Sequence, residues 1–202
     1  MKPSDFAKRT GVSQETIEKL VTYQRLLEKW QAKINLVSAT TLPDVWIRHF
    51  YDSWQVLPHL GDVPSIADLG AGAGFPGLVI AICAPEKTVH LVESDARKCA
   101  FQIEVARETG AKIKIHNTRA ERLAGELKVA AVTSRALAPL PDLLELAVPL
   151  LEPGGLCTFL KGATFKAELT AAESAWHMRV DVAASLTEPD AAILTLRDIA
   201  RK

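Results

Sequence analysis

The sequence predicts an α/β fold built on a mostly parallel sheet, and three observations carry this prediction. Between residues 65 and 173, short apolar runs alternate with helical patterns, which is typical of right-handed βαβ units. A glycine cluster at residues 70–77 joins the first apolar run to the helix that follows it. Residues 178–196 hold two more apolar runs with a short turn between them, which predicts a final antiparallel hairpin.

Five parallel strands are expected before the hairpin. They span residues 65–69, 88–93, 112–116, 129–133 and 155–161, and the helices among them span residues 78–83, 95–109, 140–150 and 165–173. The hairpin strands are expected at residues 178–186 and 191–196, with Pro189 and Asp190 between them. The seven runs together predict one seven-stranded sheet.

The first 61 residues show no strand pattern and predict a helical extension, residues 1–61, in front of the main domain, residues 62–202. Ser13 is a suitable N-cap for an amphipathic helix over residues 13–32. A second helix is expected over residues 43–57. The tryptophans of this extension, Trp30, Trp46 and Trp54, are expected in the core between the helices and the sheet.

The composition is that of one ordinary folded domain, with 202 residues, 48% of them hydrophobic and 24% charged. The net charge is zero, but residues 61–96 hold one basic and five acidic side chains, whereas residues 97–135 hold nine basic and four acidic ones. The three cysteines include no CxxC pair, which argues against disulfides or a zinc site and favours the cytoplasm. We expect a monomer with no metal ion and no membrane span.

The most informative segment is Asp68-Leu-Gly70-Ala-Gly72-Ala-Gly74-Phe-Pro-Gly77, because glycines after a strand let the backbone approach a ligand closely. Two fingerprints overlap here. Gly72-x-Gly74-x-x-Gly77 fits a dinucleotide loop, and Asp68-x-Gly70-x-Gly72-x-Gly74 fits class I S-adenosylmethionine (SAM) methyltransferases. A dinucleotide loop offers a helix N-terminus to a pyrophosphate, whereas SAM has no phosphate. The acidic surroundings and Asp68 therefore favour SAM.

Glu93, followed by Ser94, ends the second predicted strand. An acid at this place accepts hydrogen bonds from ribose hydroxyls in both NAD and SAM proteins, so it does not discriminate between them. Asp95 is a suitable N-cap for the next helix. A nicotinamide-dependent oxidoreductase and a non-catalytic SAM-binding protein therefore remain alternatives at this point.

Six short segments, in a fixed order along residues 20–198, add a more specific signal. They are Asn35-Leu-Val-Ser38, Arg48-His49-x-x-Asp52-Ser53, the glycine segment Asp68–Gly77, Arg119-Ala-Glu121, Ser134-Arg135-Ala136 and Lys161-Gly162. Their order and spacing resemble the RsmG family, also called GidB, glucose-inhibited division protein B. The glycine motif alone would indicate only a superfamily, and the other segments make the resemblance specific.

The resemblance implies an enzyme that uses SAM to methylate N7 of a single guanosine, position 527 in the 530 loop of bacterial 16S ribosomal RNA. It implies a class I SAM-dependent methyltransferase fold, which is Rossmann-like, with the final hairpin and a small N-terminal helical extension. The implied partner is 16S rRNA, in the small ribosomal subunit or an assembly intermediate of it. A class I methyltransferase acting on another substrate remains the alternative, because substrate choice depends on the extension and the loops.

The resemblance also implies SAM contacts at Gly70, Phe75, Ala120, Glu121 and Arg135. With the residues singled out above, the predicted cofactor set is Asp68, Gly70, Gly72, Gly74, Phe75, Glu93, Ser94, Ala120, Glu121 and Arg135. No acid or base is assigned, because N7 of guanine already carries an exposed lone pair. Candidates for positioning the substrate are Arg135, Lys161 and His49. An acceptor for the cationic product would be Glu121 or a carbonyl near Ser134.

RNA must be held by cations and by surfaces on which bases stack. The candidate cations are Arg25, Lys29, Lys33, Arg48, Arg97, Lys98, Arg119 and Lys161. Phe75 is a candidate wall for a guanine that has left its stack, or else it packs under the loop. His49 shares a predicted helix face with Asp52, and we interpret it first as part of a polar network between helix and core. Contact with RNA is the alternative for His49.

Overall fold

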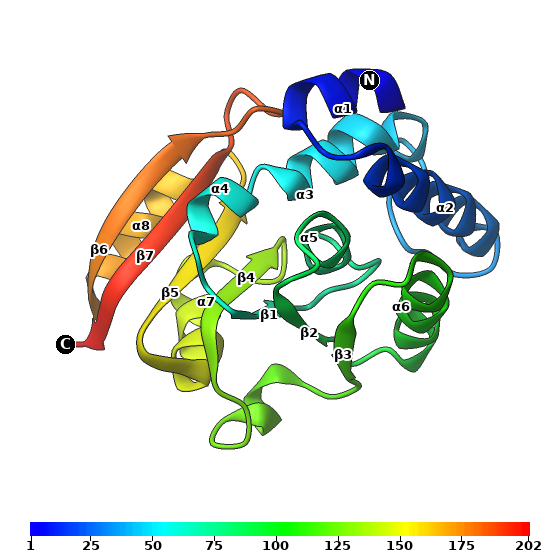
Figure 1. The fold of residues 1–202 in the computed structure, drawn as a ribbon. Helices are drawn as coiled ribbons and strands as arrows, with labels where there is room; N and C mark the ends of the chain where they lie inside the picture. The colour runs from blue at the N-terminus through cyan, green and yellow to red at the C-terminus, as the bar shows by residue number, and fades with distance from the viewer.

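The computed structural model describes residues 1–202 and contains the predicted seven-stranded sheet (Figure 1). The strand order is β3-β2-β1-β4-β5-β7-β6. The strands are β1 (Ser65–Leu69), β2 (Thr88–Val92), β3 (Ile113–His116), β4 (Val129–Arg135), β5 (Leu151–Lys161), β6 (Trp176–Ala184) and β7 (Ala192–Arg201). Strands β1 to β5 are parallel, and β7 lies antiparallel between β5 and β6. The mostly parallel sheet with a C-terminal hairpin is confirmed.

Helices cover both faces of this sheet (Figure 1). The longer ones are α1 (Pro3–Thr10), α2 (Gln14–Gln31), α5 (Gly77–Cys83), α6 (Ala96–Thr109), α7 (Leu140–Ala147) and α8 (Phe165–Glu173). Short turns of helix are η1 (Leu42–Asp44), η2 (Trp46–Tyr51), α3 (Asp52–Trp54), α4 (Leu57–Leu60), η3 (Ala120–Leu123) and η4 (Val148–Leu150). None of these helices is both long enough and apolar enough to cross a bilayer.

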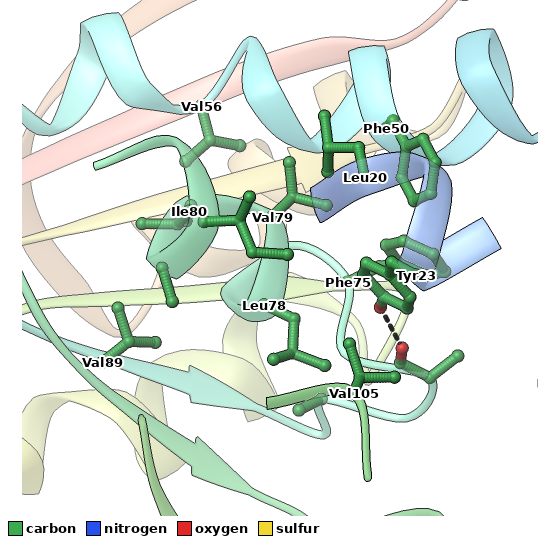
Figure 2. Packing of buried hydrophobic residues seen from close by; sticks show 14 of the residues in the cluster. Leu20, Tyr23, Phe50, Val56, Phe75, Leu78, Val79, Ile80, Val89 and Val105 are labelled. Carbon is green, nitrogen blue, oxygen red and sulfur yellow. Dashed lines mark hydrogen bonds between the residues drawn. The ribbon is translucent and has the colours of Figure 1, made fainter. Parts of the chain in front are cut away.

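The hydrophobic core is divided by the sheet into two clusters. One cluster joins α1, α2 and η2 to α5, α6 and one face of the sheet, and the other joins η3, α7 and α8 to the opposite face. Figure 2 shows the first cluster, in which Tyr23 and Phe50 of the extension lie near Phe75, at the end of the glycine loop. Full burial of each such side chain stabilises the fold by roughly 1.5–3 kcal/mol. Residues 1–61 therefore share their core with the sheet.

Two parts of the extension differ from the prediction. Helix α1 was not predicted, although Pro3 stands in its first turn and Gly11 ends it with a φ of 71°. The helix expected over residues 43–57 forms over residues 42–54, but it is not a regular α-helix, because the chain passes from η1 through a π-helical turn in η2 to α3. Wider turns of this kind are frequent at functional sites, and η2 carries two of the candidate residues, Arg48 and His49.

Most of the predicted helix caps and strand boundaries agree with the structure. The Ser13 hydroxyl accepts a hydrogen bond from the Thr16 N–H at 3.2 Å, and Asp95 accepts one from the Arg97 N–H at 2.8 Å, so both caps are confirmed. Strand β5 begins at Leu151, earlier than predicted, because Leu151 pairs with Val129 before the register shifts. The two hairpin strands are displaced by one or two residues from their predicted starts, and β7 continues to Arg201.

Candidate active site

The glycine loop leaves the carboxyl end of β1 with three glycines at positive φ, namely Gly70, Gly72 and Gly74 at 65°, 56° and 88°. A Cβ on Gly72 would have no neighbour nearer than the Gly70 carbonyl oxygen at 3.7 Å, so the loop is open there. A Cβ on Gly74 would stand only 2.3 Å from Leu78 Cδ1. Gly72 therefore faces free space, whereas Gly74 is required for packing on α5.

The buried side chain of Asp68 joins this loop to the start of α5. Its carboxylate is fully buried, and Oδ2 accepts a hydrogen bond from the Gly77 N–H at 2.8 Å at the start of α5, while Oδ1 has no partner. Burial raises the pKa of Asp68 to about 7, although the Gly77 N–H and Arg135 act in the opposite direction. The Asp68 side chain thus fixes the loop to the helix.

Glu93 holds the loop from the neighbouring strand. One of its oxygens accepts a hydrogen bond from the Gly72 N–H at 2.9 Å, and the other from the Asp95 N–H at 2.8 Å. Its side chain is buried but reaches the cavity beside the loop. An ionised carboxylate has about four acceptor positions, so Glu93 keeps capacity for a ligand's hydroxyls.

A first cavity, of about 320 Å³, lies at the carboxyl ends of β1 and β2. Its lining is Gly70, Gly72, Val92, Glu93, Ser94, Lys98, Thr118, Arg119, Ala120, Glu121, Ala136, Leu137 and Leu146. Six of the ten predicted cofactor residues are here, namely Gly70, Gly72, Glu93, Ser94, Ala120 and Glu121. The other four, Asp68, Gly74, Phe75 and Arg135, do not line it. Ligands of parallel α/β sheets bind at this edge.

The first cavity contains charges of both signs. Lys98 and Arg119, predicted as RNA contacts, line it together with Glu93 and Glu121, and neither cation forms an ion pair. Open space at Gly72 and an acidic residue at the end of β2 fit SAM, which carries an amino-acid end, a sulfonium and a ribose. The residues present therefore fit this cofactor.

Phe75 lies in the core among the buried residues of the first cluster (Figure 2), and it does not line the first cavity. Its ring is stacked between those of His49 and Tyr23, with centroid distances of 4.9 Å and 5.3 Å, and the side chain is only 3% exposed. The Tyr23 hydroxyl donates to the Ala73 carbonyl, which ties the glycine loop to α2. Packing under the loop is therefore confirmed for Phe75, and the wall for a flipped base is not formed by this ring.

A second cavity, of about 400 Å³, lies beside the first at the ends of β4 and β5. Its lining is Arg48, Asp52, Arg135, Ala136, Leu137, Ala138, Pro139, Leu160, Lys161, Gly162, Glu168, Ser185, Thr187, Glu188, Ala191 and Ala192. Ala136 and Leu137 belong to both linings and so form the wall between the cavities. Ala136 has a φ of 54°, a strained conformation of the kind found at functional sites.

Arg135, at the end of β4, connects the sheet to the extension. It donates to His49 Nδ1 at 3.0 Å, to Asp52 at 3.2 Å and to the Arg48 carbonyl at 3.2 Å, and its guanidinium lies 5.0 Å from the Phe75 ring centre. Because guanidinium only donates, His49 Nδ1 is unprotonated. Together with these contacts to the extension, Arg135 lines the second cavity and not the first.

His49 is a neutral member of this network. Its Nε2 lies 2.9 Å from the Thr41 hydroxyl, to which it donates, since Nδ1 accepts from Arg135. Burial, together with Arg135 and Arg48, lowers the pKa of His49 to about 3. The polar network between helix and core is confirmed, with the correction that Arg135, not His49, contacts Asp52.

Every cation of the second cavity is paired with a carboxylate of the same cavity. The pairs are Arg48 with Glu188, Arg135 with Asp52 at 3.2 Å, and Lys161 with Glu168 at 2.5 Å. Burial raises the pKa of Glu168, but hydrogen bonds from Lys161 and Thr164 outweigh it and leave that pKa below its ordinary value. Asp52 was singled out from the sequence, but its pairing with Arg135 was not predicted, and Glu168 and Glu188 were not identified, because these pairs depend on tertiary structure.

The remaining predicted RNA contacts lie outside both cavities. Arg25 and Lys33 are exposed, Lys29 pairs with Glu104 at 3.1 Å, and Arg97 pairs with Asp95 at 3.3 Å. Exposed pairs of this kind contribute little to stability. The structure thus separates the predicted cations into those that line a cavity and those on the open surface.

Comparison with known proteins identifies the family. Residues 16–193 match the GidB family model, described as rRNA small subunit methyltransferase G. The chain belongs to this family. It is 49% identical to the ribosomal RNA small subunit methyltransferase G of Paramagnetospirillum magneticum, and the match covers 100% of the chain and 98% of that relative. It is 51% identical to the ribosomal RNA small subunit methyltransferase G of Rhodospirillum centenum, and the match covers 98% of the chain and 91% of that relative.

Solved structures support the fold. The structure of cofactor-bound Rv0187 from MTB superposes with a TM-score of 0.61 and 11% sequence identity. The match covers 89% of this chain and 89% of that structure. The N-methyltransferase NodS from Bradyrhizobium japonicum, in complex with S-adenosyl-L-homocysteine, matches 87% and 97% at 15% identity, with a TM-score of 0.57. The chain therefore has the class I methyltransferase fold, and as a member of the rRNA small subunit methyltransferase G family it uses SAM. This excludes the dinucleotide alternative for the glycine segment.

Proposed function

We propose that this chain transfers a methyl group from SAM to N7 of one guanosine, position 527 in the 530 loop of 16S rRNA. The observation that carries the proposal is the pair of adjacent cavities at one edge of the sheet, which share Ala136 and Leu137 in their linings. One cavity is lined by the glycine loop and by Glu93, which suit SAM, and the other contains three cations, each paired with a carboxylate. A cofactor in the first cavity and a base in the second would be direct neighbours.

In this proposal the first cavity holds SAM. The open backbone at Gly70 and Gly72 lies against the cofactor, Glu93 accepts hydrogen bonds from the ribose hydroxyls, and Ser94, Ala120 and Glu121 complete the lining. When bound, SAM supplies an electrophilic methyl group on its sulfonium. Asp68, Gly74 and Phe75 act indirectly, because they hold the loop in place.

The second cavity receives the target base, which must leave its stack to enter. Arg48, at the exposed side of this cavity, is the cation placed to meet the RNA backbone, whereas Arg135 and Lys161 are held by Asp52 and Glu168 and shape the cavity. N7 of guanine carries a free lone pair, so the protein needs no general base. The chain contributes by holding N7 toward the wall shared with the first cavity and by excluding water.

The proposal also assigns roles to the two parts of the chain. Residues 62–202 form the SAM-binding methyltransferase domain, and residues 1–61 form an extension that contributes Arg48 and Asp52 to the second cavity. The substrate is the small ribosomal subunit or an assembly intermediate of it, so the proposed location is the cytoplasm. A monomer suffices, because both cavities are lined by a single chain.

The test is transfer of labelled methyl from SAM to small-subunit particles and to naked rRNA from a strain that lacks this protein. Chain cleavage at 7-methylguanosine then maps the modified position. We expect label at one guanosine in the 530 loop. Label on another RNA position would change the target, and SAM binding without RNA label would contradict the proposed substrate while keeping the cofactor.

A further inference from the structure

The proposed function raises the question of which group in the second cavity selects guanine. N7 and O6 lie on one edge of guanine and are acceptors, whereas N1–H and N2–H₂ on the Watson–Crick edge are donors. A residue that recognises the N1–H and N2–H₂ donors, which lie away from N7, must therefore accept hydrogen bonds. The second cavity offers three carboxylates, Asp52, Glu168 and Glu188.

Two of these carboxylates are already occupied. An ionised carboxylate has about four acceptor positions, and Asp52 and Glu168 each use three of them. The donors to Asp52 are Arg135, Gln55 and Thr187, and those to Glu168 are Lys161, Thr164 and the Leu140 N–H. Neither can accept two adjacent donors of a base without losing a partner.

Glu188 differs from the other two. Its Oε2 accepts from a single partner, Arg48, and its Oε1 accepts from none. Its side chain is 47% exposed and that of Arg48 is 42% exposed, so this ion pair stands at the mouth of the cavity where an incoming RNA would meet it. An exposed pair costs little to open, which leaves Glu188 free to exchange its partner.

The turn that carries Glu188 is nevertheless fixed in place. The Leu186 N–H donates to Gln55 Oε1 at 2.7 Å, and the Thr187 hydroxyl donates to Asp52 at 2.6 Å. Gln55 is only 1% exposed, so the turn between β6 and β7 is fastened to a buried part of the extension. The Glu188 carboxylate therefore starts from a backbone that is already positioned against the cavity.

We propose that Glu188 selects the target base by accepting hydrogen bonds from both N1–H and N2–H₂ of guanine. Arg48, released from the ion pair, then turns to the RNA phosphates. Adenine presents an unprotonated N1 at the same place, whose lone pair would face the carboxylate. This inference rests on the proposed function, since it takes the second cavity as the place of the target base.

Inosine provides the test, because it lacks N2–H₂ but keeps N1–H, O6 and N7. Single-turnover methylation is measured on small-subunit particles whose 16S rRNA carries guanosine or inosine at the target position. We expect the unmodified enzyme to favour guanosine by about tenfold or more, the range expected for one good base contact. In Glu188→Ala both rates should fall, because both bases lose the contact to N1–H. The guanosine rate should fall further, because it also loses the contact to N2–H₂, so that the ratio of the two rates approaches one.

Asp190→Ala is the matched control. Asp190 is an exposed acid in the same turn, and it lines neither cavity, so this change removes a nearby negative charge without touching the proposed contact. We expect Asp190→Ala to keep the full preference for guanosine. Both variants should bind SAM and unfold as the unmodified protein does, because neither side chain is buried.

A preference for guanosine that survives in Glu188→Ala would overturn the inference while leaving the proposed function intact. Loss of the preference in Asp190→Ala as well would overturn it too, because a general charge effect would then explain both. An unmodified enzyme that methylates neither substrate at N7 would instead contradict the proposed function, and this inference with it.

Discussion

The two cavities face the same edge of the sheet, yet they hold their charges in different ways. In the first, Glu93 binds backbone N–H groups, and Lys98 and Arg119 form no ion pair. In the second, each cation is paired with a carboxylate, and two of the three pairs, Arg48 with Glu188 and Arg135 with Asp52, join distant parts of the chain. The first cavity thus depends mainly on hydrogen bonds to backbone, and the second on ion pairs between side chains. Substitutions should affect them separately.

The largest effect is expected from a side chain placed in the glycine loop. Gly72→Asp puts a carboxylate at a position that is open to the first cavity and next to Glu93. Overpacking and like-charge repulsion of about 3 kcal/mol would weaken SAM binding by roughly a hundredfold. Calorimetric titration with SAM measures this loss.

Gly110→Asp is the control for Gly72→Asp. Gly110 also has a positive φ, 68°, and a Cβ there meets no atom within 4 Å, but it ends α6 and lines neither cavity. We expect this variant to bind SAM normally. Equal losses in the two variants would show that backbone strain, and not occupation of the first cavity, explains the effect.

The second cavity should be disabled by Arg135→Ala. This change leaves Asp52 without its ion-pair partner and removes the contact to His49, so we expect a destabilisation of about 1–3 kcal/mol. Methyl transfer to RNA should fall on the order of a hundredfold, because the base is no longer positioned. SAM affinity should stay nearly unchanged, since Arg135 does not line the first cavity.

Arg135→Lys restores the charge beside Asp52 but not the planar set of donors, so it should recover stability more than activity. Urea unfolding, SAM titration and single-turnover methylation separate the three quantities. If SAM affinity falls as far as the methylation rate, Arg135 contacts the cofactor and the division between the two cavities is wrong.

A pH-dependent effect is expected from Asp68, which supports the first cavity from the core. Its pKa is 3.8 in a model peptide and about 7 in the folded protein, so between these pH values the folded state binds a proton that the unfolded state does not. Raising the pH through this range therefore removes stability. Asp68→Asn should abolish that loss while keeping an acceptor for the Gly77 N–H.

The stability of Asp68→Asn relative to the unmodified protein should therefore increase from pH 4 to pH 7, by about 2–4 kcal/mol. Urea unfolding at several pH values measures the difference between the two proteins, which cancels the contribution of other titrating groups. A difference that stays constant, or one that grows as the pH falls, would contradict the assignment of the shift to Asp68.

The smallest effect is expected on the open surface. Arg97→Ala removes a cation that lines neither cavity and whose partner, Asp95, keeps its backbone hydrogen bond from residue 97. Stability and SAM binding should not change. RNA affinity should fall by no more than the contribution of about one phosphate contact. The slope of the logarithm of the binding constant against the logarithm of salt concentration should become shallower by about one at most. A loss as large as that of Arg135→Ala would move the RNA site to this surface.

The sequence predicted the strands, most helices and the glycine loop because these depend on local patterns. Helix α8 has the predicted bounds, and the two predicted caps form. Six predicted cofactor residues line the first cavity, since all lie in the segments that follow the parallel strands β1, β2 and β3. These segments are brought together by the topology alone, which strand alternation already indicates.

The second cavity was less predictable, because its lining comes from residues 48 to 192 and depends on tertiary contacts. Arg135 was assigned both to the cofactor and to positioning of the substrate, and the structure places it in the lining of the second cavity. Phe75 was offered as a wall for the base, although its ring stacks on those of His49 and Tyr23 in the core. No local pattern shows that Glu188 meets Arg48 across 140 positions of the chain. Such pairings are a property of the fold and not of any segment.

The attachment of the β6–β7 turn to Gln55 also makes the second cavity depend on nearly the whole length of the chain. Every residue that lines the first cavity stands at or before Leu146, whereas the lining of the second extends to Ala192. A chain cut short between these two positions would therefore lack part of the second cavity, although it would still carry every residue of the first.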